Sequence, residues 1–226
     1  MPAEFDCHSE TYQRMLDQTV RLTGDDGRYF AELKARYLAG IFGASFSGRV
    51  LDFGCGVGLL AQSLLRHLPA CRLDGYDPSS ASIDRIEPEV HSQGKFTSAD
   101  DALDASYDLI VLANVMHHVS GDKRGETILT LYSRLAPGGH LVVFEHNPAN
   151  PLTRWAVHIC PFDVNAVLLW PGEVRKHFRR ARLRTVRLDY ITFFPRWCAW
   201  FRPFEPYLSW CPLGAQYALL GRKIGS

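Results

Sequence analysis

The sequence predicts an α/β fold in which a mostly parallel sheet is covered by helices on both faces, a doubly wound arrangement. Short apolar segments alternate with helical ones, and a glycine-rich turn joins the first of these strands to the next helix. The chain has 226 residues, of which 46% are hydrophobic and 22% charged, so it can bury a sizeable core. This length fits one α/β domain with added segments better than two complete domains.

Two helices are expected before the alternation begins. Residues 10–23 place apolar side chains at helical spacing, and Gly24 and Gly27 interrupt that pattern. Asp26 is a candidate N-cap for a second helix, over residues 28–42. We therefore interpret residues 1–48 as an N-terminal helical cap within a single domain that spans residues 1–226.

Strands and helices then alternate along the chain. Strands are expected at 49–53, 71–76, 95–98, 108–113 and 140–145. Helices are expected between them at 59–67, 79–86 and 125–135, and Pro137-Gly138-Gly139 is expected to form a turn. This alternation predicts that neighbouring strands run parallel.

The alternation stops after Glu145 and later resumes. Residues 147–172 contain four prolines among large apolar side chains and are interpreted as an inserted, substrate-side segment. A helix at 173–181 and strands at 184–193 and 215–222 follow. Residues 195–213 are dense in Trp, Phe, Tyr and Pro and form a second insertion.

The main chemical motif is the glycine loop Asp52-Phe53-Gly54-Cys55-Gly56-Val57-Gly58, which joins a strand to a helix. Glycines permit positive φ and close approach of a ligand, and a helix N-terminus offers unpaired N–H donors. Dinucleotide enzymes use G-x-G-x-x-G here, whereas in this chain the third glycine comes one residue early. The Asp52 carboxylate would repel a pyrophosphate and attract an ammonium group. The loop therefore favours a cationic amino-acid cofactor over NAD, although a tight turn without a ligand is the alternative.

Asp77-Pro78-Ser79 follows the second predicted strand. An acid about 20 residues after the glycine loop, at the C-terminal end of a strand, can accept both hydroxyls of a ribose. Asp77 can also cap the helix that follows, with Pro78 in its first turn, and the two roles are compatible.

Five segments together resemble the class I S-adenosylmethionine-dependent methyltransferases: VLDFGCGVG (50–58), YDPS (76–79), SADD (98–101), DLIVLANVMHHV (108–119) and LAPGGHLVVFEHNP (135–148). The resemblance is strongest over residues 25–146. It implies a seven-stranded sheet whose last strand is antiparallel. It also implies S-adenosyl-L-methionine as the cofactor and S-adenosyl-L-homocysteine as the product. The segments 147–172 and 195–213 have no general family pattern.

The resemblance further implies which residues contact the cofactor. The glycine loop would hold the methionine moiety, Asp77 the ribose, and Asp100 or Asp101 the adenine amine. The segment after the fourth strand would line the cofactor and the mouth of the substrate site, and a looser match places Tyr29 and Lys34 nearby. The expected cofactor-binding residues are Tyr29, Lys34, Asp52, Gly54, Cys55, Gly56, Gly58, Asp77, Pro78, Ser79, Asp100, Asp101, Ala113 and Asn114.

Three histidines are the candidate catalytic residues. His117 and His118 follow the fourth predicted strand and His146 follows the fifth, at the carboxyl ends where ligands sit in open α/β sheets. Histidine can take a proton from a hydroxyl, acid or amine near neutral pH. Alternatively, one of them pairs with a local carbonyl, or an ionised acceptor needs no base and requires only alignment and desolvation.

Two runs in the C-terminal third have several interpretations. Eight basic side chains between 175 and 187 are interpreted as a solvated helix face. The eight aromatic side chains between 193 and 210 are interpreted as core or as a lid over the substrate site. The alternatives are a dimer contact or, together with the arginines, peripheral contact with a membrane or an acidic, lipid-linked acceptor.

Composition argues against several other classes. The net charge of +1 gives no sign of a nucleic-acid partner. None of the six cysteines forms a C-x-x-C pair or has zinc spacing, so we expect free thiols, no metal and a cytoplasmic location. Residues 1–10 do not resemble a signal peptide, and the sequence contains no run of 18 apolar residues.

The expected function is methyl transfer to a small-molecule acceptor, in secondary or in glycan or lipid metabolism. One alternative keeps the cofactor but uses its sulfonium for an intramolecular cyclisation. The other is a non-catalytic partner subunit, against which the intact set Asp52, Gly54, Gly56, Asp77 and Asp100 argues.

Overall fold

The computed structural model describes residues 26–100, 103, 106–159 and 166–224. The predicted helix at 10–23 lies outside these residues. In chain order the elements are α2 (Gly27–Phe42), β1 (Arg49–Phe53), α3 (Leu59–His67), β2 (Arg72–Tyr76), α4 (Ser80–Ile83), α5 (Pro88–His91), β3 (Gly94–Thr97), β4 (Tyr107–Ala113), α6 (Arg124–Arg134), β5 (Leu135–His146), α7 (Pro151–Ile159), α8 (Pro171–Arg180), β6 (Leu183–Ile191), the 3₁₀ segment η3 (Arg196–Leu208) and β7 (Gln216–Lys223).

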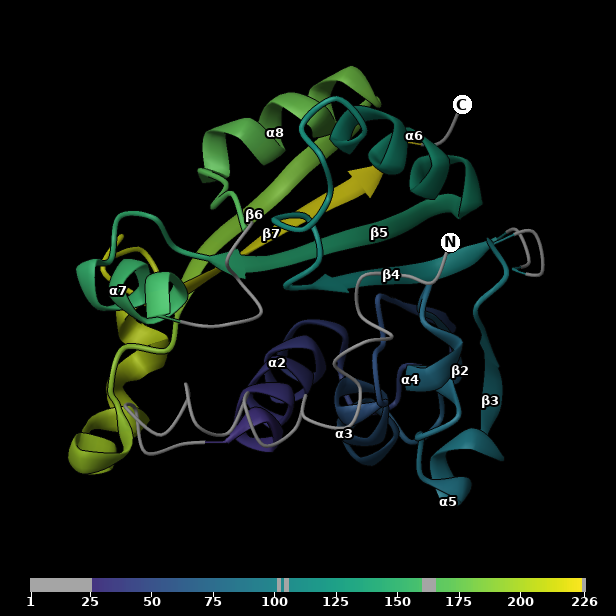
Figure 1. Cartoon of the computed structure of the whole chain (residues 1–226), viewed down its shortest axis with the longest axis horizontal. Helices are drawn as coiled ribbons and strands as arrows, with labels where there is room; N and C mark the ends of the chain where they lie inside the picture. The colour runs from purple at the N-terminus through teal and green to yellow at the C-terminus, as the bar shows by residue number, and fades with distance from the viewer. Residues whose placement is uncertain (1–25, 101–102, 104–105, 160–165, 225–226) are drawn as a thin grey trace.

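All seven strands form one sheet, in the order β3-β2-β1-β4-β5-β7-β6 (Figure 1). The first five strands run parallel, and β7 pairs antiparallel with both β5 and β6. The predicted doubly wound sheet with an antiparallel last strand is therefore confirmed. The winding direction reverses between β1 and β4, and ligands bind beside such a switch point in open α/β sheets.

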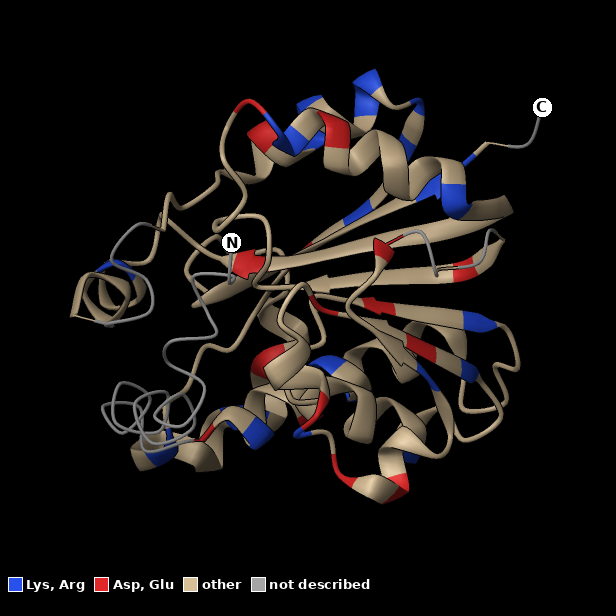
Figure 2. Cartoon of the chain, turned by 45° about the vertical axis from the view of Figure 1, so that its right-hand side comes forward, with Lys and Arg blue, Asp and Glu red and all other residues tan. Residues whose placement is uncertain are grey.

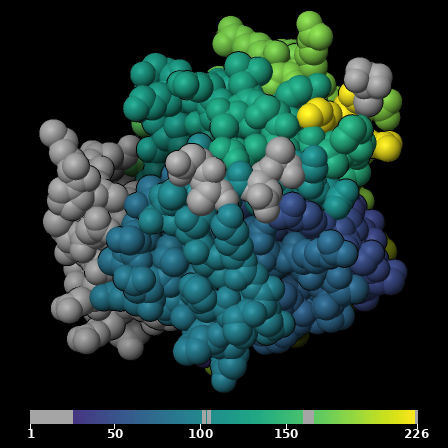
Figure 3. Space-filling model, turned by 90° about the vertical axis from the view of Figure 1, so that its right-hand side faces the viewer, coloured from purple at the N-terminus to yellow at the C-terminus, as the bar shows by residue number. Residues whose placement is uncertain are grey.

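Helices cover both faces of the sheet. In Figure 1, α2 and α3 lie below it and α6 and α8 lie above it. The buried strand β4 shows why, because its apolar side chains alternate between the two faces. Leu109 and Val111 pack into the core beneath α2 and α3, whereas Ile110 and Leu112 pack into the core beneath α6 and α8. Figure 3 shows the molecule from the side of β3, with the purple and blue segments from residue 26 to about residue 100 below the teal and green segments that follow them.

Most predicted elements occur within one or two residues of their expected bounds, with three exceptions. The predicted helix 79–86 is shortened to α4, Ser80–Ile83, and a second short helix that was not predicted, α5, starts at Pro88, where the first turn of a helix tolerates proline. The predicted turn at 137–139 is a bulge inside β5, where the pairing with β4 jumps from Leu135 to His140. The insertion 147–172 contains the unexpected helix α7, which Asn150 caps by accepting from the Thr153 N–H at 3.0 Å.

The C-terminal third corrects one further expectation. The aromatic side chains of η3 are not core: Cys198 is the only buried residue of this element. The arginines at 179, 180, 182 and 184 are exposed, as a solvated face requires, and α8 is the most strongly basic ribbon in Figure 2. Cys55, Cys71, Cys198 and Cys211 are free thiols as expected. Cys7 and Cys160 lie outside the described residues.

Candidate active site

The glycine loop lies at the carboxyl end of β1, beside the switch point. Gly54, Gly56 and Gly58 all have positive φ, of 83°, 52° and 80°. A side chain at Gly54 would place its Cβ 2.4 Å from Val115 Cγ2, so this glycine is needed for close packing. At Gly56 a Cβ would meet no atom within 4 Å. The loop therefore leaves open space at Gly56, where a ligand can approach the backbone.

Asp77 closes the loop from the end of β2. Its Oδ2 accepts the N–H of Gly56 at 2.9 Å, and its Oδ1 accepts the N–H of Ser79 at 3.0 Å. The N-cap of α4 is Ser79, whose hydroxyl accepts the Ser82 N–H, so Asp77 is not the cap. The structure thus joins two segments of the predicted cofactor set, the glycine loop and Asp77-Pro78-Ser79, through one carboxylate. Pro78 is exposed beside them.

A buried carboxyl and a buried amine lie beneath this loop. Asp52 is 1% exposed, and its Oδ2 has no hydrogen-bond partner among the residues described. Burial, and then the charge of Asp77, raise the pKa of Asp52 to about 7, against the opposing effect of Lys34. Burial lowers the pKa of Lys34, on α2, to about 8, although the charges of Glu145 and Asp52 oppose this shift. A buried carboxyl oxygen that lacks a donor, next to open backbone, fits a ligand with an ammonium group.

The segment after β4 adds a second unsatisfied acceptor. Asn114 has φ of 60° and donates its N–H to Phe144 O at 2.9 Å, while its Oδ1 is buried without a partner in the described structure. Asn tolerates this left-handed conformation better than most residues. Ala113, just before it, is half-buried at the end of β4.

The remaining predicted cofactor residues are more dispersed. Cys55 is buried, which raises its thiol pKa and makes it an inert packing group. The guanidinium carbon of Arg202, on η3, lies 4.1 Å from the centroid of the Tyr29 ring, so Tyr29 contacts η3. Asp100 is exposed and forms an ion pair of 3.1 Å with Arg134. Asp101 lies outside the described residues.

The three predicted histidines form one cluster, which we call the histidine row: His117, His118 and His146. The ring of His117 lies 4.1 Å from that of His118 and 5.2 Å from that of His146, measured between centroids. His117 is buried, His146 is half-buried and His118 is exposed. The row therefore leads from the interior of the sheet edge toward the surface.

Glu145, which the sequence analysis did not single out, lies behind the histidine row. Its Oε2 lies 2.6 Å from His117 Nδ1, and its Oε1 accepts the Met116 N–H at 2.8 Å. Burial alone would raise the pKa of Glu145, but the charge and hydrogen bond of His117 and the charge of His146 hold this pKa below its usual value. An ionised carboxylate can only accept, so Nδ1 of His117 carries the proton and Nε2 is left as the basic atom.

Arg124 is a second residue that the sequence analysis missed. It is buried at the start of α6, and its Nε donates to the carbonyls of Met116 at 3.2 Å and Val119 at 2.9 Å. Its Nη2 donates to Val167 O at 3.3 Å. Arg124 thereby holds the loop that carries His117 and His118.

Comparison with known proteins places this geometry in a family. A family model described as a methyltransferase domain matches residues 18–196. The carboxy-S-adenosyl-L-methionine synthase of Pseudomonas aeruginosa (strain UCBPP-PA14) is 32% identical over 122 residues, which cover 47% of this chain and 50% of the relative. The ubiquinone biosynthesis O-methyltransferase of Marinobacter nauticus is 28% identical over 164 residues, which cover 65% of this chain and 68% of the relative.

The first of these matches spans only about half the length of the relative. A solved S-adenosylmethionine-dependent methyltransferase from Archaeoglobus fulgidus superposes with a TM-score of 0.71 at 16% identity, covering 94% of this chain and all of the other. At this identity the likeness concerns the fold. From the family model, the strand order and the glycine loop, we conclude that the chain belongs to the class I S-adenosylmethionine-dependent methyltransferases.

Proposed function

We propose that this chain transfers a methyl group from S-adenosylmethionine, the cofactor typical of its family, to a small-molecule acceptor. The observation that carries this proposal is the corner where Asp77 meets the Gly56 N–H above the buried, unsatisfied oxygen of Asp52. A pyrophosphate would meet two carboxylates there, whereas a ligand with an ammonium group and a ribose finds acceptors for both.

The residues present would divide the cofactor between them. Asp77 would accept the ribose hydroxyls, and the open backbone at Gly56 would face the methionine moiety. Asp52 would lie beneath the methionine end of the cofactor, and its charge would be balanced by that of Lys34. Asn114 would offer its buried Oδ1, and Asp100 or Asp101 would contact the adenine. When bound, S-adenosylmethionine supplies an electrophilic methyl group on a sulfonium.

The chain's own chemistry in this proposal is proton removal and exclusion of water. Nε2 of His117 is the basic atom, because Glu145 holds the proton on Nδ1. His146 and His118, which are more exposed, would stand between His117 and the acceptor, so the proton would leave the acceptor through the histidine row. Phe53, Tyr76 and Val115, at the carboxyl ends of β1 and β2 and just after β4, are partly buried apolar side chains that would reduce competition by water.

A second candidate function is favoured by one comparison. The first curated relatives are carboxy-S-adenosyl-L-methionine synthases, which suggests a reaction that modifies the sulfonium cofactor itself. This likeness covers about half of each chain. The longer match to ubiquinone biosynthesis O-methyltransferases favours a hydroxyl acceptor on a small molecule.

The decisive experiment follows the fate of S-adenosylmethionine that carries a labelled methyl group. The protein is incubated with this cofactor and a series of phenol and quinol acceptors, and products are identified by mass spectrometry. The proposal predicts S-adenosylhomocysteine and a labelled acceptor, with neither formed by Asp77→Ala. Methylthioadenosine, or a carboxylated sulfonium in a parallel incubation that contains a carboxylic acid as donor of the carboxyl group, would instead show that the cofactor itself is transformed. Cofactor binding without any product would indicate a non-catalytic subunit.

A further inference from the structure

Every tryptophan of this chain is at least half exposed, which is unusual for the largest aromatic side chain. Three of them, Trp197, Trp200 and Trp210, are 70%, 69% and 75% exposed. They belong to a larger apolar surface, which we call the aromatic face: Leu152, Trp155, Trp197, Trp200, Phe201, Phe204, Tyr207, Trp210 and Leu213. An exposed apolar surface of this kind marks a site of interaction.

The two segments that form the aromatic face are fastened to each other by side chains. Asn147 Nδ2 donates to Pro212 O at 3.0 Å and to Gly214 O at 2.7 Å, and Asn150 Nδ2 donates to Leu213 O at 2.7 Å. Thr153 Oγ1 donates to Ala215 O at 3.0 Å. The start of α7 is thus joined to the chain that follows η3, so the two insertions form one surface.

Further contacts brace η3 against the segment that leads into it from β6. Glu205 accepts the N–H groups of Phe193 and Phe194, both at 2.9 Å, and Arg202 Nε donates to Phe194 O at 3.0 Å. These bonds hold the segment although almost none of its side chains enters the core. The aromatic side chains are therefore presented outward on a braced backbone.

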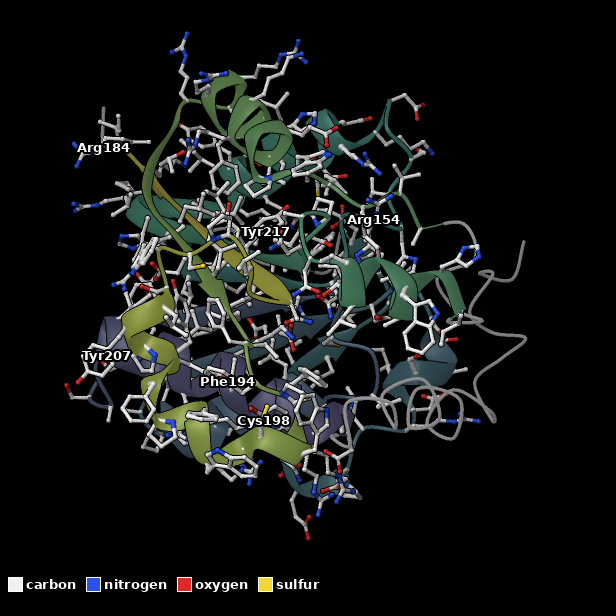
Figure 4. The ribbon with its side chains drawn as sticks, turned by 90° about the vertical axis from the view of Figure 1, so that its left-hand side faces the viewer. Arg154, Arg184, Phe194, Cys198, Tyr207 and Tyr217 are labelled. Atoms are coloured by element: carbon white, nitrogen blue, oxygen red, sulfur yellow. The ribbon has the colours of Figure 1, made fainter. Side chains whose placement is uncertain are left out.

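The aromatic face lies beside the candidate active site. In Figure 1, α7 and η3 lie at the end of the molecule toward which the arrows of β4 and β5 point. Figure 4 looks onto this end, with Arg154 on α7 and with Tyr207 at the outer edge of η3. The chain passes directly from His146, in the histidine row, through Asn147 into α7. An acceptor that enters at the carboxyl edge of the sheet would pass this surface.

The charge of the aromatic face is positive. Residues 151–159 and 196–213 contain three arginines and one acid, Glu205, which gives a formal charge of +2. That single carboxylate is occupied by two backbone N–H groups, and α7 carries no acidic residue (Figure 2). Arg154, Trp155 and His158 line a shallow hollow on α7 together with Pro151. Trp and Tyr with adjacent cationic side chains are typical of surfaces that lie in the interface of an anionic bilayer.

We propose that the aromatic face docks onto the surface of an anionic lipid bilayer. A protein partner or a second copy seated there would cover the approach to the carboxyl edge, whereas a bilayer can deliver a lipid-soluble acceptor through the same face. Only this last point, the source of the acceptor, rests on the proposed function. The contact is interfacial, since no helix within the described ranges has the length and apolar character needed to cross a bilayer.

The test uses the full-length protein and vesicles of phosphatidylglycerol and phosphatidylcholine. The exposed indoles make their own fluorescence the first readout, because their emission shifts to shorter wavelength when they leave water. We expect this shift and co-flotation with the vesicles, with partitioning about fivefold weaker for each of the exposed arginines, Arg154 and Arg196, that is replaced by Ala. Trp197→Ser/Trp200→Ser/Trp210→Ser should lower partitioning at least about tenfold.

Two control variants separate this proposal from the others. Leu129→Ser removes an apolar side chain of α6 that is 51% exposed and lies outside the aromatic face, and Arg179→Ala/Arg180→Ala removes charge from α8, so both variants should keep vesicle binding. Unfolding temperatures of all variants should match, because the altered side chains are exposed. Absence of vesicle binding, or equal binding by the triple tryptophan variant, would overturn the proposal. So would a native dimer that becomes monomeric in that variant, since a second copy would then occupy the face.

Discussion

Replacing Glu145 by Gln tests the proposed proton transfer at its most buried point. The Gln side chain has nearly the same volume and can still accept the Met116 N–H through Oε1. Its amide nitrogen, however, would face His117 Nδ1, where the carboxylate oxygen now lies at 2.6 Å. An amide donor there forces the proton of His117 onto Nε2, so the ring can no longer accept a proton from the acceptor side.

The size of both effects follows from the burial of this pair. Loss of a charge-assisted hydrogen bond lowers the free energy of unfolding by about 1.5–3 kcal/mol. For a chain of this length, that corresponds to a fall in unfolding temperature of roughly 3–12 °C. Loss of a positioned base reduces kcat by about 10²- to 10⁴-fold. The pH dependence of any remaining activity should also change, because the carboxylate charge that faces His117 is gone.

The assay is steady-state release of S-adenosylhomocysteine as a function of pH, with thermal unfolding measured in parallel. His117→Ala should lose a similar factor in kcat, and the double variant little more, because the two residues act as one unit. A merely structural role for Glu145 would lower stability and leave the pH profile unchanged. A folded Glu145→Gln protein with the native kcat and pH profile would refute the reasoning.

Two predictions concern the glycine loop. Gly54→Ala should destabilise the protein by about 2–4 kcal/mol through its positive φ and the contact with Val115, measured by chemical denaturation. Gly56→Ala should lower the free energy of unfolding by only about 1 kcal/mol, because its Cβ would point into open space. The same Cβ would stand where the ligand approaches, so affinity for S-adenosylhomocysteine should fall at least about tenfold. Equal losses of stability in Gly54→Ala and Gly56→Ala would contradict this. The pKa of Asp52 is raised to about 7 in the folded protein, so the protonated carboxyl is favoured by folding at low pH. The ligand-free protein therefore loses this contribution to its free energy of unfolding as the pH rises from about 4 to about 7. The free energy of unfolding of Asp52→Asn, compared with that of the native chain, should therefore rise by up to about 4 kcal/mol between pH 4 and pH 7. If the two free energies instead change in parallel with pH, Asp52 does not titrate in this range.

The sequence predicts the sheet well because its central strands β1 and β4 are rich in apolar residues and are followed by clear breakers. β1 and α3 begin and end at the expected residues, because the three glycines between them supply the positive φ angles that the tight turn requires. The helix α7 was not foreseen because four prolines obscured its pattern, although Pro151 stands where a helix tolerates proline, at its first position.

The candidate site was predicted less completely, for a physical reason. The histidines were found from their places after strands, but Glu145 looked like part of an apolar strand and its partner lies 28 residues earlier in the chain. The sequence signal that could have identified Glu145 is its place at the end of a buried apolar strand, directly before His146. The aromatic residues after β6 resemble core in composition, and only their position outside the sheet packing shows that they are exposed.

The central claim is that the corner between the glycine loop and Asp77 binds an adenosyl sulfonium cofactor. Titration calorimetry of the native protein with S-adenosylhomocysteine tests it most directly. Asp77→Asn should weaken binding by about 10²- to 10⁴-fold, because two charge-assisted hydrogen bonds to the ribose are lost. A variant at the exposed C-cap of α4, Asp84→Asn, should bind as the native chain does. One site per chain with this pattern is the predicted result, and a native protein that shows no binding, or an Asp77→Asn protein that binds equally well, would contradict the account.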